Sequence, residues 1–169
     1  WVAESLPLAR GWERQTDMAD DPLFYRPGAL DARSYRHWLL ADGVRYVALP
    51  AAPIDFAGTT EARLLRAGVP GLRPVWRGHD WRVWRVVGSR GLAGPGATVL
   101  SVEVDSVTVR VHRPGAVVLR VRWNGDWRVR TGVGCVSPSA GGWTTLRVRR
   151  AGTVRLAVGL SGRGACGAH

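Results

Sequence analysis

The chain has 169 residues, of which 24 are basic and 13 acidic, so its formal net charge at pH 7 is +11. An apolar content of 46% and a charged content of 22% exclude a disordered polar chain and predict a packed core. Every basic residue is an arginine, and this charge favours anionic partners such as phosphorylated lipids, acidic glycans or nucleic acid.

The first regular element predicted along the chain is a helix that follows a loop. Asp31 is a typical helix N-cap, because its side chain can accept a hydrogen bond from the backbone of the first turn. Tyr35, Trp38 and Leu39 then recur at the spacing of one helical face. Gly43 is a typical residue just beyond a helix end, so we expect the helix to stop there.

A strand, a second helix and a hairpin are predicted next. Residues 45–49 are short and apolar, which favours a buried strand. The second helix is predicted to begin at Thr59 or Thr60. Residues 72–77 and 81–87 are rich in strand formers and are separated by a polar turn, so they predict a β-hairpin.

The sequence pattern changes at residues 89–97, a glycine-rich stretch that predicts a junction between two subdomains. Residues 1–88 would form a small α/β subdomain, and residues 98–169 contain short β-rich segments joined by turn formers. This spacing predicts an antiparallel β-sandwich of the jelly-roll kind, and therefore an α+β fold for the chain. The predicted strands of the sandwich are residues 99–104, 107–111, 116–123, 127–130, 144–149 and 153–158.

Alternating side chains predict that the strands of this sandwich have one apolar and one arginine-bearing face. Leu119, Val121 and Trp123 share one face of their segment, while Arg120 and Arg122 share the other. The arginine face is either a solvated surface or a contact surface for phosphate groups or anionic membrane. Nucleic acid is the less favoured partner, because no tryptophan evidently shares the face with the arginines.

Cys135 and Cys166 are the only cysteines. Neither has a neighbouring Cys or His at metal-ligand spacing, so we expect no metal site, and no motif indicates another cofactor. In an oxidising compartment the two could form a disulfide that closes a loop of about 30 residues. The alternative is two separate thiols.

No arrangement of residues predicts catalysis. The four histidines have no evident nucleophile and carboxylate partners, as a Ser-His-Asp triad would need. Glu13 and Asp17 are the densest acidic pair of the kind that glycosidases use, but such proximity is common. We therefore assign no catalytic residue and leave open whether a longer protein containing this chain is an enzyme.

Two groups of residues are candidate ligand contacts. Tryptophan can stack on sugar rings. Trp76, Trp81 and Trp84 cluster on the predicted hairpin, where at least one tryptophan should be partly exposed or at a domain interface, and Trp81 and Trp84 are the candidate contacts. A dense polar segment near the N-terminus could form a binding edge, or it could be a capped loop between subdomains. That segment consists of Trp12, Glu13, Arg14, Gln15 and Asp17.

Short motifs at residues 10–17, 22–25, 35–39, 43–50 and 81–86 together resemble a known group of proteins. They resemble the C-terminal soluble region of multi-pass membrane proteins from high-G+C Gram-positive bacteria, many of them uncharacterised, which are similar to GT-C-type lipid-linked glycosyltransferases. The resemblance implies a location on the outer side of the membrane. It carries over no catalytic residue, because the catalytic carboxylate of that superfamily typically lies between early membrane helices.

The resemblance and the charge predict a non-catalytic, extracytoplasmic accessory domain of a membrane-embedded glycosyltransferase-like protein, with a role in binding a glycan or lipid-phosphate acceptor. Its expected partners are the membrane-embedded remainder of the same chain and a glycan or polyprenyl-phosphate-linked sugar. Because residue 1 is Trp1 and no signal peptide follows, we expect a longer precursor. The alternatives are a stand-alone carbohydrate-binding β-sandwich module and a basic adaptor for anionic lipid or nucleic acid.

Overall fold

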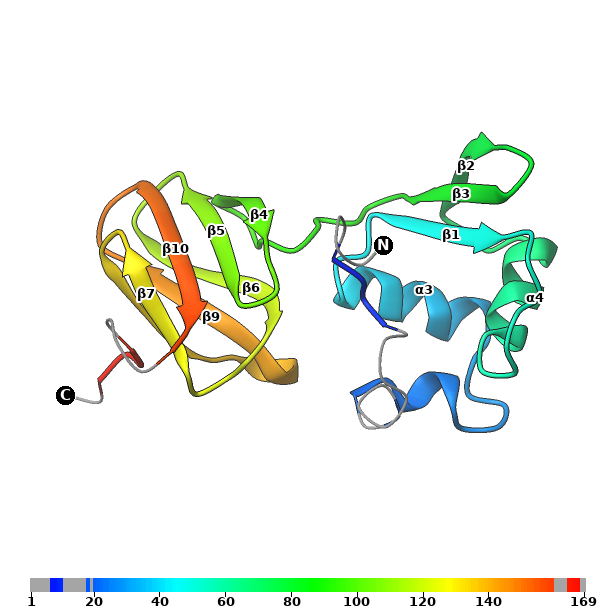
Figure 1. The fold of residues 1–169 in the computed structure, drawn as a ribbon, viewed down its shortest axis with the longest axis horizontal. Coiled ribbons are helices and arrows are strands. Elements are labelled where there is room, and N and C mark those ends of the chain that lie inside the picture. The colour runs from blue at the N-terminus through cyan, green and yellow to red at the C-terminus, as the bar shows by residue number, and fades with distance from the viewer. Residues whose placement is uncertain (1–6, 11–17, 19, 160–163, 168–169) are drawn as a thin grey trace. The chain divides into compact units, whose positions relative to one another are not determined.

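The computed structural model describes residues 7–10, 18, 20–159 and 164–167. These residues are mostly antiparallel β-sheet, and the chain divides into two compact units (Figure 1). The N-terminal unit spans Leu8–Arg90, and the C-terminal unit contains Gly91–His169. Each unit has its own hydrophobic core, so each is described by itself.

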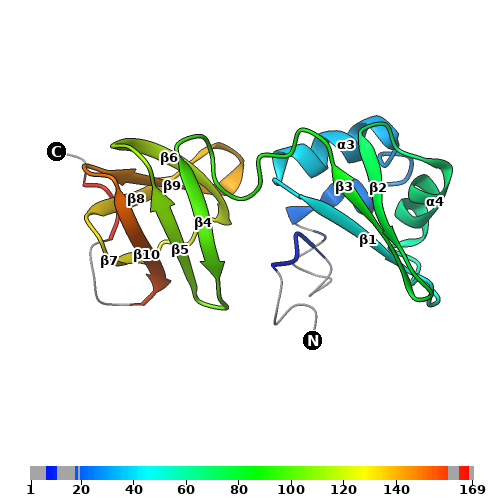
Figure 2. The same cartoon turned by 90° about the horizontal axis from the view of Figure 1, so that it is seen from above.

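The N-terminal unit is a three-stranded antiparallel sheet with helices packed on one of its faces (Figure 2). Its elements are η1 (Pro22–Phe24), α3 (Ala32–Ala41), β1 (Tyr46–Pro50), α4 (Thr59–Ala67), β2 (Leu72–Arg77) and β3 (Trp81–Val86). The strand order is β1-β3-β2. The predicted order of helix, strand, helix and hairpin is therefore confirmed. The core lies between the sheet and the two helices, and includes Tyr35, Leu39, Val47, Leu49, Ala62, Leu65 and Val86.

Local signals at both ends define α3. The Asp31 carboxylate accepts a hydrogen bond from Ser34 N at 2.7 Å, and Asp31 N donates to Ser34 Oγ at 2.9 Å, which is a capping box. At the other end, Gly43 has a φ of 70°. Val44 N donates to Leu39 O at 2.9 Å and Gly43 N to the carbonyl of residue 40 at 3.3 Å, the two bonds of a Schellman motif. Both predicted helix ends are confirmed.

The capping carboxylate makes the start of α3 sensitive to pH. The hydrogen bonds from Ser34 hold the pKa of Asp31 below its ordinary value of 3.8. A depressed folded-state pKa gives stability that is present at neutral pH and is lost as the pH falls through that pKa. We expect Asp31→Ala to unfold at lower urea than wild type at pH 7, with a deficit that shrinks in acid, while Asp31→Asn keeps a capping side chain. A deficit for Asp31→Ala that is constant with pH would contradict this.

The C-terminal unit consists of two antiparallel sheets that share one core, in a sandwich-like arrangement. Its strands are β4 (Ala97–Val102), β5 (Ser106–Val111), β6 (Gly115–Arg122), β7 (Trp127–Thr131), β8 (Gly134–Pro138), β9 (Trp143–Val148) and β10 (Gly152–Val158), with a 3-10 turn η2 (Ala140–Gly142). One sheet has the order β4-β5-β10-β7 and the other β6-β9-β8. Both sheets contribute to the core, which includes Val107, Val109, Val111, Leu119, Val129, Val136, Leu146, Val148 and Leu156.

The predicted alternation of apolar and arginine side chains is confirmed in β6. Leu119 is fully buried, and Val121 and Trp123 pack against the core. Arg122 is exposed, whereas Arg120 is partly buried because its guanidinium donates to a backbone carbonyl at residue 91. The two-residue alternation in the sequence therefore identifies which side chains of β6 form the interior.

One strand of the sandwich was missed by the sequence prediction. None of the predicted strands includes residues 134–138, where Gly134 and Pro138 are poor strand formers. In the structure this stretch is β8, which pairs with β9, and Val136 is fully buried. Pairing with a neighbouring strand, rather than local propensity, makes it a strand.

Short segments cover both edges of the β6-β9-β8 sheet. At the β6 edge, Gly94 N donates to Val118 O at 2.8 Å. At the β8 edge, Cys166 N donates to Val136 O at 2.8 Å, beside a parallel bridge between Val136 and Ala165. Covered edges leave fewer unpaired backbone groups that could template pairing with another chain.

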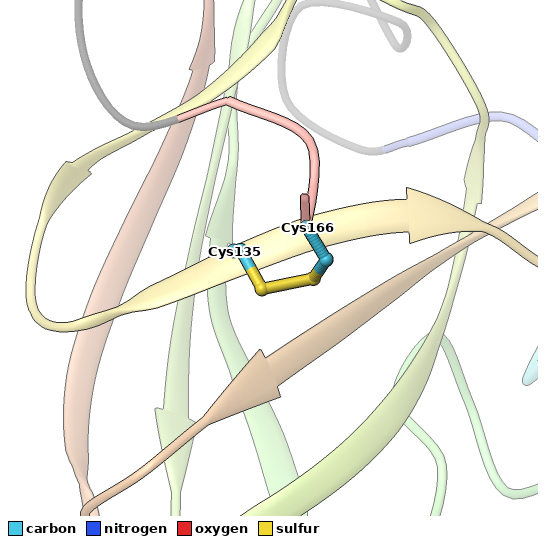
Figure 3. Close-up of a disulfide and its surroundings, with 2 residues drawn as sticks. All are labelled: Cys135 and Cys166. Atoms are coloured by element: carbon cyan, nitrogen blue, oxygen red, sulfur yellow. A yellow bond between two sulfur atoms is a disulfide. The ribbon is translucent and has the colours of Figure 1, made fainter. Parts of the chain in front are cut away.

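Cys135 and Cys166 form a disulfide, with the two sulfur atoms 2.05 Å apart and the Cα atoms 4.9 Å apart (Figure 3). The bond joins β8 to the segment that covers its edge. The predicted pairing of the two cysteines is therefore confirmed, and the alternative of two separate thiols is wrong.

Candidate binding face on the N-terminal sheet

The β1-β3-β2 sheet has one face on the core and one face in solvent. Successive strand residues point to opposite faces, and residues directly opposite each other on paired strands share a face. Val47 lies opposite Trp84, and both belong to the inner face that packs against the helices. Tyr46 lies opposite Arg85, and both are exposed. The outer face of this sheet is the candidate site.

A β-bulge in β2 places Trp76 on the outer face. The pairing with β3 shifts register between Pro74 and Trp76, so Val75 is the extra residue and Trp76 lies opposite Val83. Without the shift Trp76 would lie opposite Arg82, on the inner face. Bulges commonly redirect a side chain in this way, and proline is tolerated at such positions. The side chain of Trp76 is 53% exposed.

The turn of the hairpin leaves room for the Trp76 indole. A Cβ atom added at Gly78 would lie only 2.4 Å from the Cη2 atom of Trp76, so the ring lies over this glycine. Gly78 N donates to Trp81 O at 2.9 Å, which places Gly78 and Trp81 opposite each other at the end of the hairpin. Trp81 lies opposite Pro50 and shares the outer face with Trp76. The two tryptophans are thus diagonal neighbours.

The outer face has a cationic row and an aromatic end. Arg73 lies opposite Arg85, which in turn lies opposite Tyr46, so these three cross the sheet in one row. Both arginines are exposed, and Tyr46 is 59% exposed. The next row contains Trp76, and the hairpin end contains Trp81. We call this surface the aromatic-arginine face, and its residues are Tyr46, Arg73, Trp76, Trp81, Val83 and Arg85.

The structure places the predicted contact residues in different environments. Trp81 is partly buried on the aromatic-arginine face, whereas Trp84 lies on the inner face and packs against the core. The expectation that at least one tryptophan of the hairpin is exposed is confirmed by Trp76, which was not among the predicted contact residues. Its position depends on a bulge that strict alternation does not reveal. Tyr46 was not among the predicted contact residues either. The polar segment of Trp12, Glu13, Arg14, Gln15 and Asp17 lies outside the described residues.

The tryptophans of the sandwich serve packing. Trp127 is buried, and its Nε1 donates to Arg122 O at 3.0 Å. Trp123 packs against the core, and the Arg122 guanidinium lies 4.4 Å from the ring centroid of Trp143. All three rings are buried or partly buried. Among the tryptophans that the structure describes, Trp76 of the N-terminal sheet is the strongly exposed one.

Within the described ranges, no cluster of three or more His, Cys, Asp and Glu side chains could hold a metal ion. Among the same residues, no helix is long and apolar enough to cross a membrane. No protein-family model, no curated protein and no solved structure matches this chain. The function is therefore argued from the geometry of the aromatic-arginine face.

Proposed function

We propose that this chain is a non-catalytic, extracytoplasmic accessory domain of a membrane-embedded glycosyltransferase-like protein, and that its aromatic-arginine face binds a glycan. The observation that carries the proposal is the gathering of Tyr46, Trp76 and Trp81 on the solvent side of a sheet whose other side is already packed. Single exposed apolar residues are ordinary, but several aromatic rings on one face are typical of a contact surface.

The chemistry of these rings favours a sugar over a purely apolar ligand. A pyranose has one face of C–H groups that can lie flat on an indole, while its hydroxyl groups need polar partners. The aromatic-arginine face offers both, because Arg73 and Arg85 lie beside the rings and each guanidinium has five N–H donors. An open sheet face also suits a section of an extended glycan better than a small enclosed ligand.

The arrangement of the sandwich supports a further part of the proposal, that it is a jelly roll shortened by one hairpin. The strands pair in a nested order, β5 with β10 and β6 with β9, as they do when a long hairpin folds over on itself. β7 joins β10 at the end of one sheet, and β8 joins β9 at the end of the other. Jelly rolls include lectin domains, although fold alone does not assign function.

The disulfide and the net charge support the proposed location. A bond between Cys135 and Cys166 is stable in an oxidising compartment, such as the outer side of a membrane. The formal charge of +11 favours proximity to anionic headgroups and to lipid phosphates. In this proposal the partners are the membrane-embedded remainder of the chain and a glycan or polyprenyl-phosphate-linked sugar. The transferase chemistry belongs to that remainder.

The test is glycan binding by the purified chain. We expect binding on an array of bacterial oligosaccharides, and Trp76→Ala should weaken the tightest interaction at least about tenfold in calorimetric titration, which corresponds to about 1.4 kcal/mol. Gly78→Ala should also weaken it, because the added methyl group would displace the Trp76 ring. Phe56→Ala is the matched control, since Phe56 is 67% exposed but lies outside this face.

Three outcomes would contradict the proposal. The first is the absence of glycan binding, and the second is binding that both Trp76→Ala and Trp81→Ala leave unchanged. The third is binding to nucleic acid or anionic vesicles that falls steeply with salt and ignores both tryptophans, which would favour the basic adaptor instead.

A further inference from the structure

Arg73 and Arg85 form a like-charged pair on the aromatic-arginine face. They lie directly opposite each other on β2 and β3, and both are exposed. Side chains in such positions have Cβ atoms about 4.5–5.5 Å apart, and like charges there are destabilising. Among the residues that the structure describes, no acidic side chain pairs with either arginine. The repulsion is therefore not balanced within this part of the protein.

An exposed arginine of the sandwich provides a comparison, because a carboxylate lies beside its guanidinium. Arg155 is also exposed on a sheet, but its guanidinium lies 3.2 Å from the Glu103 carboxylate and donates to Ser106 Oγ at 3.1 Å. The same contacts keep the pKa of Glu103 below its ordinary value, with the Ser106 hydrogen bond as the largest cause. The contrast indicates that an anion from outside the chain fits between Arg73 and Arg85.

The distance between the cationic row and the aromatic row fits one sugar and its substituent. Trp76 lies opposite Val83, which is two residues along β3 from Arg85. Two residues of a strand span about 6.6–6.8 Å. An anionic group between the arginines would thus lie about one sugar ring away from a pyranose stacked on Trp76. Tyr46 lies beside Arg85 at the end of the cationic row and offers a phenolic hydroxyl to the same ligand.

From these contacts we infer that the aromatic-arginine face selects acidic glycans, with a carboxylate or phosphate held between Arg73 and Arg85 and the adjacent sugar ring on Trp76. This inference rests on the proposed glycan-binding function and adds the class of ligand. Guanidinium groups suit both anions, since each can donate two parallel hydrogen bonds to a carboxylate or a phosphate.

The hairpin offers a matched control for the charge. Arg77 and Arg82 also lie directly opposite each other and are also exposed, but their pair belongs to the opposite face of the sheet. Replacing either pair by glutamine removes the same charge from the same hairpin. Only the Arg73 and Arg85 pair shares a face with Trp76, so a specific site predicts different effects of the two double variants.

The experiment compares trigalacturonate with neutral galactotriose, and uses inorganic phosphate as an anion without a sugar. We expect wild type to bind trigalacturonate at least about tenfold more tightly than galactotriose, and R73Q/R85Q to remove most of that preference. R77Q/R82Q should keep this preference within about twofold of the wild-type value.

Inorganic phosphate should compete with trigalacturonate for binding to the wild-type protein. Trigalacturonate should also raise the Tm of wild type but not of R73Q/R85Q, which removes a repulsion and should fold at least as stably as wild type.

Each other result overturns the inference. Equal binding of the acidic and neutral sugars, still sensitive to Trp76→Ala, would remove the anion site and leave the proposed function standing. Failure of both sugars to bind would remove the inference, and failure across the wider array would also remove the proposed function. Equal losses of trigalacturonate affinity in R73Q/R85Q and R77Q/R82Q would indicate general charge attraction rather than a specific site. Binding to phosphatidylglycerol vesicles that needs Arg73 and Arg85 but not Trp76 would assign the face to a lipid surface.

Discussion

Glu61→Ala is expected to lower the free energy of unfolding of the N-terminal unit by about 3 kcal/mol, the loss typical of breaking a largely buried ion pair. The Glu61 carboxylate accepts a hydrogen bond from the Tyr35 hydroxyl and lies 2.8 Å from the Arg10 guanidinium. Arg10 in turn lies 3.7 Å from the ring centroid of Phe24. These contacts join four separate segments of the chain, and Glu61→Ala removes two of the contacts directly.

Urea unfolding followed by tryptophan fluorescence measures this effect. Glu61→Gln is the matched variant, because it keeps an acceptor for Tyr35 and removes only the charge, so its loss should be smaller. A loss below about 1 kcal/mol for Glu61→Ala would show that the network contributes no more than an exposed pair.

The same network predicts how the unit responds to alkaline pH. Burial, and then the charge of Glu61, raise the pKa of Tyr35 above its ordinary value of 10.0. A raised folded-state pKa gives stability that is fully present below the unfolded value and is lost as the pH rises above it. The unit should therefore weaken above about pH 10, and Tyr35→Phe should show a flatter dependence there.

Removal of the disulfide is expected to lower the free energy of unfolding of the C-terminal unit by about 3 kcal/mol, on the chain-entropy model. Cys135 and Cys166 are 31 residues apart, so reduction greatly enlarges the freedom of the unfolded chain. The double variant Cys135→Ser/Cys166→Ser should match reduced wild type and should not respond to reductant.

Hydrogen exchange gives a second, local measure of the same bond. The Cys166 amide donates to Val136 O at 2.8 Å, and the disulfide holds that segment on β8. We expect this amide to exchange faster after reduction, while the amides of β5, whose pairing partners are β4 and β10, change little. Equal urea midpoints and equal exchange in the oxidised and reduced proteins would contradict both expectations.

The parts of the fold that local chemistry specifies were predictable. Asp31 and Gly43 mark the ends of α3 because a capping side chain and a positive φ are requirements of the backbone itself. Alternation in β6 identified Leu119 as interior, because the strand repeat has two residues. The sequence left open whether Cys135 and Cys166 are bonded, but as the only two cysteines they could form only the one disulfide that the structure shows.

The parts that depend on pairing between distant segments were not predictable. β8 is a strand because β9 lies beside it, although it begins with Gly134 and ends with Pro138, which are poor strand formers. Trp76 reaches the outer face only through the extra residue at Val75, and a simple two-residue repeat would place it on the other side. The candidate site therefore became visible only with the register of β2 and β3 known.

The residues that follow Arg90 do not only connect the two units, because some of them pair with β6. Ala93 forms an antiparallel β-bridge with Leu119, and Arg120 N donates to Leu92 O at 2.7 Å. This stretch therefore behaves as a short extra strand of the sandwich. Anyone cutting the protein into recombinant fragments should begin the second one at Gly91 rather than at Ala97. The shorter fragment would leave backbone donors and acceptors along the β6 edge unpaired. We expect such fragments to associate through these exposed edges.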